Sequence, residues 1–421
     1  MKTMEHCNVK IFTDNIEDLA LEQIHRLLSM DAFYGCKIRI MPDVHAGAGC
    51  VIGFTGNMGD KVIPNIVGVD IGCGILVQPL VLKTKIDYHA FNEHILYAIP
   101  TGRNSRMNCH MPLPEQYMNC YREAKKLILE LHCYRELKEQ KRLYKSIGSL
   151  GGGNHFIELG RDEQNRMYLM VHTGSRNLGK QVADIYQNLA IKYNSGWDKL
   201  LAKQTQLIEE YKQTGRKNEL QAAIRDLHNS FKMRKPSMPS ELCYVEGVLR
   251  EDYLHDMRLC QRWAQINRRL IADLLIDFLV RQGCIADTDR QNAFESVHNY
   301  IGDDNIIRKG AISACRGERC IIPLNMRDGS LLCTGKGNED WNNSAPHGAG
   351  RVLSRKRAFR ELHLDEFQKA MDGIYSETVT EATLDESPMA YKPAEEILQN
   401  IQETVDVISV IKPTFNFKAA E

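Results

Sequence analysis

The sequence predicts an α+β protein with a central sheet system, peripheral helices and a helical hairpin inserted at the surface. Two kinds of segment alternate along the chain. Glycine-rich, β-branched stretches occupy residues 41–77, 147–179 and 321–352, and the segments between them have the periodicity of amphipathic helices. No internal repeat and no clean linker divides the sequence. We therefore expect a single domain over residues 1–421, in which the glycine-rich stretches converge on one site.

The individual elements follow from local patterns. The first glycine-rich stretch contains VIGFT and NIVGVDIGCGILVQPL, which predict strands joined by tight turns. Residues 117–145 are rich in Leu, Glu and Lys, with apolar residues three and four apart, and predict one amphipathic helix. Residues 197–232, interrupted at Thr214-Gly215, predict the helical hairpin. The tract KPSMPS is a predicted loop, and residues 246–280 predict a further helix.

Composition limits where nucleic acid could bind. The chain has 421 residues with 54 basic and 54 acidic side chains, so its formal net charge is zero. Proteins that neutralise many phosphates usually carry a basic excess, so positive charge that contacts RNA or DNA must be local here. Hydrophobic residues make up 43% of the chain, which supports a sizeable core and argues against a disordered chain or a coiled coil.

The 13 cysteines are scattered from Cys7 to Cys333 without a CxxC pair. This spacing argues against a disulfide framework and a zinc ribbon, and it fits a reducing compartment. The N-terminal segment lacks the apolar core of a signal peptide, and no uncharged apolar run reaches the roughly 18 residues of a membrane helix. The sequence therefore predicts a cytoplasmic protein without membrane contact.

Five of the 14 histidines lie in contexts unlike the helical or polar surroundings of the other nine. Glycine beside a histidine lets the backbone approach a ligand closely, which a purely structural histidine seldom needs. Any one of the five could still be structural, but together they favour a functional site. They are His45 in MPDVHAGAG, His155 in GSLGGGNHF, His172 in VHTGSR, His298 in SVHNY and His347 in SAPHGAGR.

Asp70 and Cys73 lie three residues apart in VGVDIGCG, at an expected strand end or tight turn where their side chains can converge. Cys, His and Asp together suit zinc, manganese, iron or cobalt, and they do not suit calcium or magnesium alone. A thiolate can bridge two metals, so these few ligands could hold a pair. For the other cysteines, a small buried hydrophobic side chain is the better interpretation.

Neither common phosphate-binding scaffold is present. The tract CTGKGNED has glycine after Lys336 and lacks the upstream spacing of a P-loop. The tract HAGAGCVIG matches the Rossmann fingerprint only loosely, and no helix pattern follows Gly53. A bound nucleotide would have to use another scaffold.

Six motifs, in their order and spacing, resemble the RtcB family of RNA ligases, and the resemblance extends from Lys37 to Lys418. They are MPDVHAGAG, VGVDIGCG, GSLGGGNHFIE, VHTGSR, HNYI followed by IRKGAISA, and SAPHGAGRVLSR. The resemblance implies one catalytic domain with the family's α+β fold. It also implies a GTP- and Mn²⁺-dependent ligase that joins 2′,3′-cyclic phosphate or 3′-phosphate RNA ends to 5′-hydroxyl ends, in tRNA splicing or RNA repair. The implied intermediates are a histidine-guanylate and an RNA 3′-end-pp-G.

The resemblance also implies a role for each matching residue. Two Mn²⁺ ions would be bound, one by Asp70, Cys73 and His155 and the other by Cys73, His172 and His298, with Cys73 bridging. His347 would be the nucleophile that takes up GMP, and Asp43 would orient it. The residues implied to bind GTP or GMP are Asn154, Glu158, Ser330, Tyr391, Lys418, Ala349 and Gly350, with Tyr391 stacked on guanine. The residues implied to lie near phosphates or RNA are Arg176, Lys309 and Arg351.

The sequence departs from common family motifs at three places. HAGAG at residues 45–49 stands where many members have HLGKG, so a lysine is missing. Residues 323–329 stand where many members have PGSMG, and NNSAPHGAGR stands where members often have CSCSHGAGR. In the second motif, Pro346 favours extended backbone at Ala345. These changes leave open which RNA end is preferred and whether the protein is a repair paralogue.

The metal ligands and the nucleophile are all retained, so ligation is favoured over two alternatives. One is a metal-dependent RNA-end phosphoesterase without ligation, and the other is a non-catalytic RNA-binding subunit that uses the basic run at residues 355–357. We expect a monomer with GTP and RNA ends as partners. Whether an accessory protein activates it stays open. The zero net charge then predicts a small electropositive cleft on an otherwise neutral surface.

Overall fold

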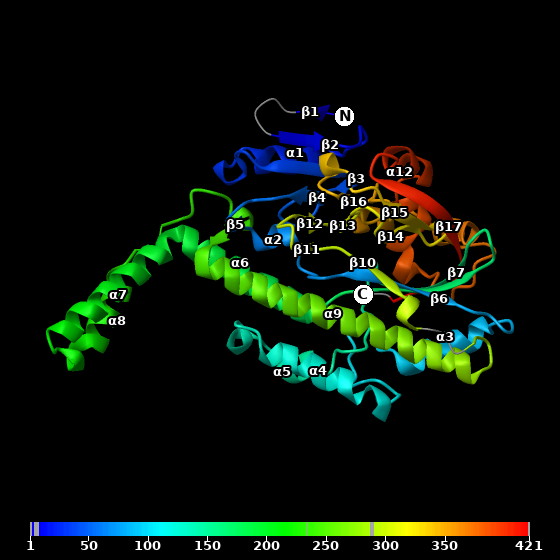
Figure 1. The fold of residues 1–421 in the computed structure, drawn as a ribbon, viewed down its shortest axis with the longest axis horizontal. Helices are drawn as coiled ribbons and strands as arrows, with labels where there is room; N and C mark the ends of the chain where they lie inside the picture. The colour runs from blue at the N-terminus through cyan, green and yellow to red at the C-terminus, as the bar shows by residue number, and fades with distance from the viewer. Residues whose placement is uncertain (1, 4–7, 233, 287–289, 420–421) are drawn as a thin grey trace.

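The computed structural model describes residues 2–3, 8–232, 234–286 and 290–419, so Cys7 lies outside the described residues. Two large sheets form the body of the molecule, with helices outside them (Figure 1). This arrangement confirms the predicted α+β class.

The larger sheet has seven antiparallel strands in the order β10-β6-β8-β7-β17-β15-β14. Its strands are β10 (Phe294–Val297), β6 (Gly74–Leu80), β8 (Met167–Thr173), β7 (Phe156–Arg161), β17 (Val405–Lys418), β15 (Gly329–Gly335) and β14 (Arg319–Asn325). The second sheet has six strands in the order β1-β2-β3-β4-β12-β11, and only β2 and β3 run parallel. Its strands are β1 (Lys2–Thr3), β2 (Asn8–Ile11), β3 (Lys37–His45), β4 (Ile52–Gly56), β12 (Ile307–Lys309) and β11 (Tyr300–Ile301).

Two short strand pairs and a set of helices complete the fold. The pairs are β13 (Ala311–Ser313) with β16 (Ser344–Pro346), and β5 (Lys61–Val62) with β9 (Val245–Glu246). The α-helices are α1 (Asp18–Leu28), α2 (Pro64–Val67), α3 (Tyr88–Ala98), α4 (Met118–Leu129), α5 (Gln140–Tyr144), α6 (Arg176–Lys192), α7 (Asp198–Gln213), α8 (Leu220–Ser230), α9 (Gly247–Arg281), α10 (Arg355–Glu361), α11 (Leu364–Ala370) and α12 (Ala394–Asn400). Short 3₁₀ turns lie at Asp31–Phe33, Glu115–Tyr117, Tyr134–Glu136, Lys217–Glu219, Ser240–Leu242, Arg290–Asn292, Glu339–Trp341, Glu381–Glu386 and Pro388–Ala390, and a π-helical turn lies at Tyr193–Trp197.

The larger sheet is buried on both faces. Side chains alternate along β6, so Leu76 belongs to the main core together with α9, whereas Ile75 and Val77 point to the other face. On that face they share a cluster with Ile321 of β14 and Leu332 of β15. Because β14 and β15 lie at the opposite end of the same sheet, the sheet curves back on itself. The strand ends near β6 are thereby enclosed, and the candidate site forms there.

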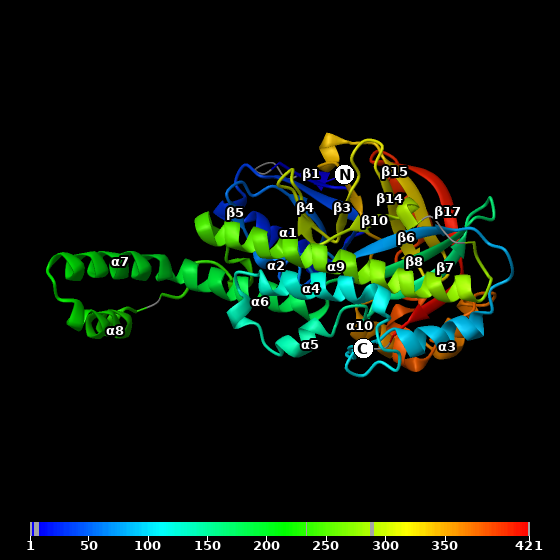
Figure 2. The ribbon, with the colours of Figure 1, turned by 60° about the horizontal axis from the view of Figure 1, so that its bottom comes forward.

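The hairpin prediction is confirmed, and so is the helix predicted over residues 246–280. The chain forms α7 and α8 on either side of Thr214-Gly215, where Gly215 adopts a φ of 72°. The two helices project from the body beyond the end of α6 (Figure 2). The second prediction corresponds to α9, which runs along the body for 35 residues (Figure 1).

The single helix predicted over residues 117–145 is wrong. The structure has α4 and α5 there, separated by an irregular segment. The backbone N–H groups of His132 and Cys133 donate to the carboxylate of Asp256 on α9, at 2.8 and 3.0 Å. These long-range bonds draw the segment into the core, where Leu131 is buried, and a continuous helix could not make them.

The sequence argued against a disulfide framework and against a membrane-spanning helix, and the structure bears on both. The 12 cysteines within the described residues are all free thiols. No helix in the described part of the chain has the length and apolar character needed to cross a lipid bilayer.

Candidate metal and nucleotide site

The ends of four neighbouring strands bring four predicted metal ligands together. Cys73 immediately precedes β6, His155 immediately precedes β7, His172 is the penultimate residue of β8, and His298 immediately follows β10. Strands β10, β6, β8 and β7 are adjacent and antiparallel, so these four positions lie along one end of the sheet. The four side chains are all buried, with exposed fractions between 2% and 5%.

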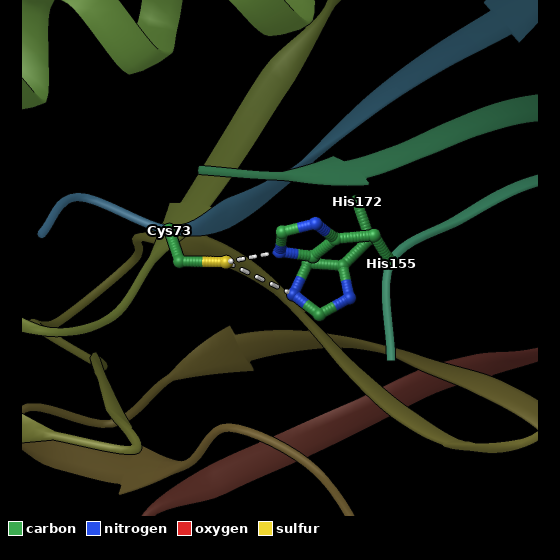
Figure 3. Close-up of side chains that lie close together, drawn as sticks. All are labelled: Cys73, His155 and His172. Atoms are coloured by element: carbon green, nitrogen blue, oxygen red, sulfur yellow. Dashed lines mark hydrogen bonds between the residues drawn. The ribbon is translucent and has the colours of Figure 1, made fainter. Parts of the chain in front are cut away.

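The thiol of Cys73 lies between two imidazoles. Its Sγ is 3.4 Å from Nε2 of His155 and 3.4 Å from Nε2 of His172 (Figure 3). Nε2 of His155 also lies 3.1 Å from Oδ2 of Asp70. A thiol, two imidazoles and a carboxylate therefore converge, and this is the mixed donor set that transition metals prefer.

Backbone carbonyls hold both imidazoles in the orientation that a metal ligand needs. Nδ1 of His155 lies 3.0 Å from the carbonyl oxygen of Leu150, and Nδ1 of His172 lies 3.1 Å from that of Asn154. With Nδ1–H donating to a carbonyl, Nε2 of each ring faces Cys73, and Nε2 of His155 also lies within hydrogen-bonding distance of Asp70. Such outer contacts are usual for metal-binding histidines, because they fix the ring and its tautomer.

The turn after β8 is shaped around the carboxylate of Asp70. The backbone N–H of Ser175 donates to Oδ1 of Asp70 at 2.9 Å. A Cβ at Gly174 would lie 2.3 Å from the same oxygen, so only glycine allows this approach. Burial would raise the pKa of Asp70, but the hydrogen bond and charge of His155, with the charge of Arg176, lower it below the ordinary value. Asp70 is therefore an anionic donor.

The rings of His155, His172 and His298 form a row that leads to His347. Ring centroids are 5.2 Å apart for His155 and His172, 5.4 Å for His172 and His298, and 4.8 Å for His298 and His347. Burial, reinforced by the neighbouring histidines, lowers the pKa of His172 and of His298 well below the ordinary value. Both rings are therefore neutral, which is the form that binds a metal.

The charge balance of this pocket fits a bound cation. Burial, followed by the charge of Asp70, raises the pKa of the Cys73 thiol well above its ordinary value. A thiolate next to a carboxylate is costly here unless a positive ion neutralises both. The ligand atoms of Cys73, His155 and His172 lie close enough together to hold such an ion, with Asp70 beside His155 and His298 beside His172.

His347 is held by a buried carboxylate. Its Nδ1 lies 2.7 Å from Oδ2 of Asp43, and the Asp43 side chain is completely buried, whereas that of His347 is 17% exposed. Gly350 makes this approach possible, because a Cβ there would lie 2.2 Å from the carbonyl oxygen of Asp43. Ala345 lies in β16, so the backbone before Pro346 is extended as expected.

A cavity of about 420 Å³ opens beside His347, and we call it the nucleotide cavity. All seven residues expected to contact GTP or GMP line it, together with His347, Arg351 and His172. These seven come from β7, β15, β17 and the segments around residues 154, 349 and 391. Residues 323–326, at the end of β14 and just after it, also line the cavity, so the departure from the family motif faces it.

Glu158 places an unpaired acceptor in the wall of the nucleotide cavity. Its Oε2 accepts a 2.6 Å hydrogen bond from Nδ2 of Asn416, whereas its Oε1 is buried without a partner among the described residues. Burial raises the pKa of Glu158 to about 8, despite the opposing effects of Asn416 and Lys418. A ligand with paired N–H donors would satisfy this carboxylate.

A second carboxylate, Glu386, holds three residues that line the cavity. Oε2 accepts hydrogen bonds from Nζ of Lys418 and from the hydroxyl of Tyr391, both at 2.6 Å, and Oε1 lies 3.1 Å from Nη1 of Arg351. Burial would raise the pKa of Glu386, but Lys418, Arg351 and Arg355 lower it to about 2. Sequence reasoning missed Glu386, because it lies in TLDESPMA, which carries no glycine or histidine motif.

Arg351, which the resemblance placed near phosphates, makes several hydrogen bonds within the protein. Besides Glu386, its guanidinium donates to the carbonyl oxygens of Leu353 and Asp385, and it stacks 5.1 Å from the ring centre of Tyr391. Arg351 lines the cavity, but its hydrogen bonds position Tyr391 and the surrounding loop.

A model of the family described as "tRNA-splicing ligase RtcB" matches residues 23–419. The chain belongs to the RtcB family. The RNA-splicing ligase RtcB of Escherichia coli strain K12 is 29% identical over 440 aligned residues, which cover 97% of each chain. The RNA-splicing ligase RtcB2 of E. coli strain ATCC 25922 is 25% identical and covers 91% of this chain and 87% of its own. The tRNA-splicing ligase RtcB of Thermococcus kodakarensis is also 25% identical, covering 92% and 88%. The predicted family and the enzyme class, an RNA ligase, are confirmed.

Arg176 lies apart from the nucleotide cavity of this RtcB-family site. It lines a second cavity, of about 610 Å³, together with Asp70, Arg103, Arg142 and Lys180, and we call this the arginine cavity. One guanidinium nitrogen of Arg176 donates to the carbonyl oxygen of Gly102 at 2.6 Å. Asp70 lines the arginine cavity and His172 the nucleotide cavity, so the metal ligands lie between the two.

Lys309, which the resemblance placed near phosphates, is buried against two backbone carbonyls. Its side chain is 5% exposed, and Nζ donates to the carbonyl oxygens of Ala48 and Asn65, at 2.7 and 3.0 Å. Lys309 lines neither the nucleotide cavity nor the arginine cavity. It instead fixes the HAGAG loop at Ala48, the position where many RtcB members carry a lysine.

Proposed function

We propose that this chain is a GTP- and Mn²⁺-dependent RNA ligase, which joins 3′-phosphate or 2′,3′-cyclic phosphate ends to 5′-hydroxyl ends through a guanylate on His347. The observation that carries the proposal is the Asp43–His347 pair, which lies between a row of metal donors and the nucleotide cavity. A phosphoesterase that only hydrolyses RNA ends would need the metal donors but no such pair.

The first step is nucleophilic attack by His347. Because Asp43 accepts a hydrogen bond from Nδ1–H, the lone pair of Nε2 is free to attack the α-phosphorus of GTP. The new bond joins Nε2 to phosphorus, the bond from the α-phosphorus to the bridging oxygen breaks, and pyrophosphate leaves. The carboxylate of Asp43 stabilises the positive charge that develops on the ring.

Asp70, Cys73, His155, His172 and His298 would hold Mn²⁺ beside this histidine. The metal, when bound, supplies polarisation of the phosphoryl oxygens and neutralises the charge that builds up in transfer. The thiol and imidazole donors favour a transition metal over magnesium.

The walls of the nucleotide cavity support guanine as the base. The unpaired Oε1 of Glu158 can accept from the adjacent N–H groups on the Watson–Crick edge of guanine, whereas adenine offers an acceptor at the ring nitrogen of that edge. Tyr391 would stack on the ring, and Lys418, held by Glu386, would contact its polar edge. Ser330 and Asn154 complete the proposed nucleotide contacts, and Ala349 and Gly350 lie in the loop that follows His347.

The remaining steps transfer the guanylate and join the ends. An oxygen of the RNA 3′-phosphate attacks the phosphorus on His347, and the nitrogen–phosphorus bond breaks to give RNA 3′-end-pp-G. The 5′-hydroxyl oxygen then attacks the RNA 3′-phosphorus, and GMP leaves as the new phosphodiester forms. A 2′,3′-cyclic end must first take up water to become a 3′-phosphate. Arg176, in the arginine cavity beside Asp70, lies where it can contact the RNA phosphate.

Labelling with α-³²P-GTP and Mn²⁺ tests the proposal. We expect a covalent guanylate on the wild type and none on His347→Ala, whereas His363→Ala, at a histidine outside the nucleotide cavity, should label normally. Label retained on His347→Ala would overturn the assignment of the nucleophile. Turnover of RNA ends that needs no GTP and survives His347→Ala would favour the phosphoesterase instead.

A further inference from the structure

A groove lined by basic side chains lies at the base of the helical hairpin, outside the site described above. Its volume is about 750 Å³, and its walls come from the start of α7, the end of α8 and the loop that follows α8. We call it the basic groove. Its five basic residues are Lys199, Lys203, Lys232, Arg234 and Lys235.

The cations of the basic groove are uncompensated. Among the described residues, none of the five forms an ion pair, although other exposed lysines pair along their helices, as Lys126 does with Glu130 and Lys180 with Asp184. The one acidic residue in the lining is Glu246, whose carboxylate accepts a 2.8 Å hydrogen bond from Tyr193. In a chain with no net charge, five such cations around one groove are a local anion-binding surface.

Aromatic rings lie among these charges. Tyr193, Phe231 and Tyr244 contribute to the lining, and the ammonium group of Lys203 lies 5.5 Å from the ring centre of Phe231. Basic side chains that follow a phosphate backbone, combined with rings on which bases stack, are typical of single-stranded RNA binding. An acidic protein segment would use the charges but would gain little from the rings.

Helix α6 connects the basic groove with the metal donors. Its first residue, Arg176, follows Ser175, whose N–H binds Asp70, and its last residue, Lys192, precedes Tyr193 of the groove. A helix of 17 residues spans about 25 Å. The arginine cavity lies at the other end of α6, so positive charge is present at both ends of this helix.

We propose that the basic groove binds the phosphate backbone of the RNA substrate about 25 Å from the end that is joined. This inference rests on the proposed function for the identity of the substrate. The RNA end would enter beside Asp70, and the chain leading away from it would follow α6 to the hairpin. The groove would then supply affinity for long RNA without a role in the chemistry.

The test measures binding of the full chain to RNA without GTP or metal, so that it is independent of ligation. The variant Lys232→Gln/Arg234→Gln/Lys235→Gln changes only the loop after α8, and Lys199→Gln/Lys203→Gln on α7 serves as a second variant. The probe is a single-stranded RNA with a 3′-hydroxyl end, long enough to span α6. We expect affinity to fall about tenfold or more. The slope of log K against log salt should flatten by about 2 in the triple variant, because three fewer phosphates of the RNA would be neutralised.

The control variant Arg122→Gln/Lys125→Gln/Lys126→Gln removes the same charge from the exposed face of α4. An RNA too short to span α6 should lose little affinity in the groove variants. Unchanged affinity and salt slope in both groove variants, or an equal loss in the α4 control, would overturn the proposal. Polyglutamate serves as a second probe, which stands for an acidic protein segment. If the groove variants lose polyglutamate binding but keep RNA binding, the proposal is also overturned, because the groove would then suit an acidic protein. If GTP labelling fails while the groove variants lose RNA affinity, the proposed function fails and the groove assignment stands.

Discussion

The carboxylate of Asp43 binds Nδ1 of His347 at 2.7 Å, across 304 residues of sequence. Asp43 lies within β3, and His347 immediately follows β16, so two different strand systems position the pair. The completely buried carboxylate selects the tautomer in which Nε2 is free. The pair would thus prepare His347 for the nucleophilic role that we propose for it.

Replacing Asp43 by Asn should slow guanylylation at least about 100-fold, because an amide neither enforces the tautomer nor stabilises the charged ring. Affinity for GTP should change little, since Asp43 does not line the nucleotide cavity. Single-turnover labelling with α-³²P-GTP measures the rate, and nucleotide binding measured separately is the control. A wild-type labelling rate in Asp43→Asn would show that the carboxylate is only structural.

Replacing Cys73 by Ser should weaken Mn²⁺ binding by more than the roughly 10- to 100-fold expected when an outer-shell partner is removed. A serine hydroxyl stays protonated and cannot serve as the soft, bridging donor. Metal analysis after equilibrium dialysis measures affinity, and with Co²⁺ the thiolate-to-metal absorption band should disappear. Cys260→Ser, at another fully buried cysteine, is the matched control and should leave the band intact. An intact band in Cys73→Ser would place the metal elsewhere.

The positions of the predicted metal donors could be inferred from sequence, because Cys73, His155, His172 and His298 each lie beside or near the end of a strand. Their convergence follows from strand order, since neighbouring antiparallel strands bring these ends together. The tautomers of His155 and His172 were not predictable, because the carbonyls that fix them depend on the exact path of the loop at residues 150–154.

The structural features that the sequence did not reveal depend on contacts between distant segments. The helix predicted over residues 117–145 is interrupted because Asp256 binds two backbone N–H groups from a distant segment. The two carbonyls that enclose the ammonium group of Lys309 come from distant segments, so its motif did not reveal them. Glu386 has no local signature at all, and its importance comes from the cations that surround it.

Binding of GTP should release a proton from Glu158. Burial raises the pKa of this carboxyl from 4.5 to about 8, so it is mostly protonated at neutral pH in the free protein. Guanine N–H donors favour the ionised form, which lowers the pKa when GTP binds. Titration calorimetry in buffers of different ionisation enthalpy should show release approaching one proton at about pH 6 to 7. The release should fade above about pH 9, and also as the pH falls to the lowered pKa of the complex.

The variant Glu158→Gln provides the control for proton release. It should bind GTP more weakly and release no proton from this position. It should also lose a pH dependence of stability, because the raised pKa of Glu158 stabilises the fold fully below about pH 4.5, and this contribution is lost as pH rises through about 8. Equal proton release in the variant and the wild type would assign the proton to another group.

Replacing Glu386 by Gln should lower the free energy of unfolding by about 3–5 kcal/mol near neutral pH, because Lys418 and Arg351 would stay buried without their counter-ion. The pKa of Glu386 is lowered from 4.5 to about 2, so its contribution is present above about pH 4.5 and is lost as pH falls towards 2. The gap between the unfolding midpoints of wild type and variant should therefore shrink on acidification.

The matched control for this charge network is Glu361→Gln on α10. The pKa of Glu361 is also lowered to about 2, by its hydrogen bonds with Arg357 and Arg360, but the group is exposed and water screens its ion pairs. Its replacement should therefore barely move the midpoint. Equal effects of the two variants would mean that burial of Glu386 contributes nothing. A large effect confined to Glu386→Gln, together with weaker GTP binding, would show that the network holds Tyr391 and Lys418 in place for the nucleotide.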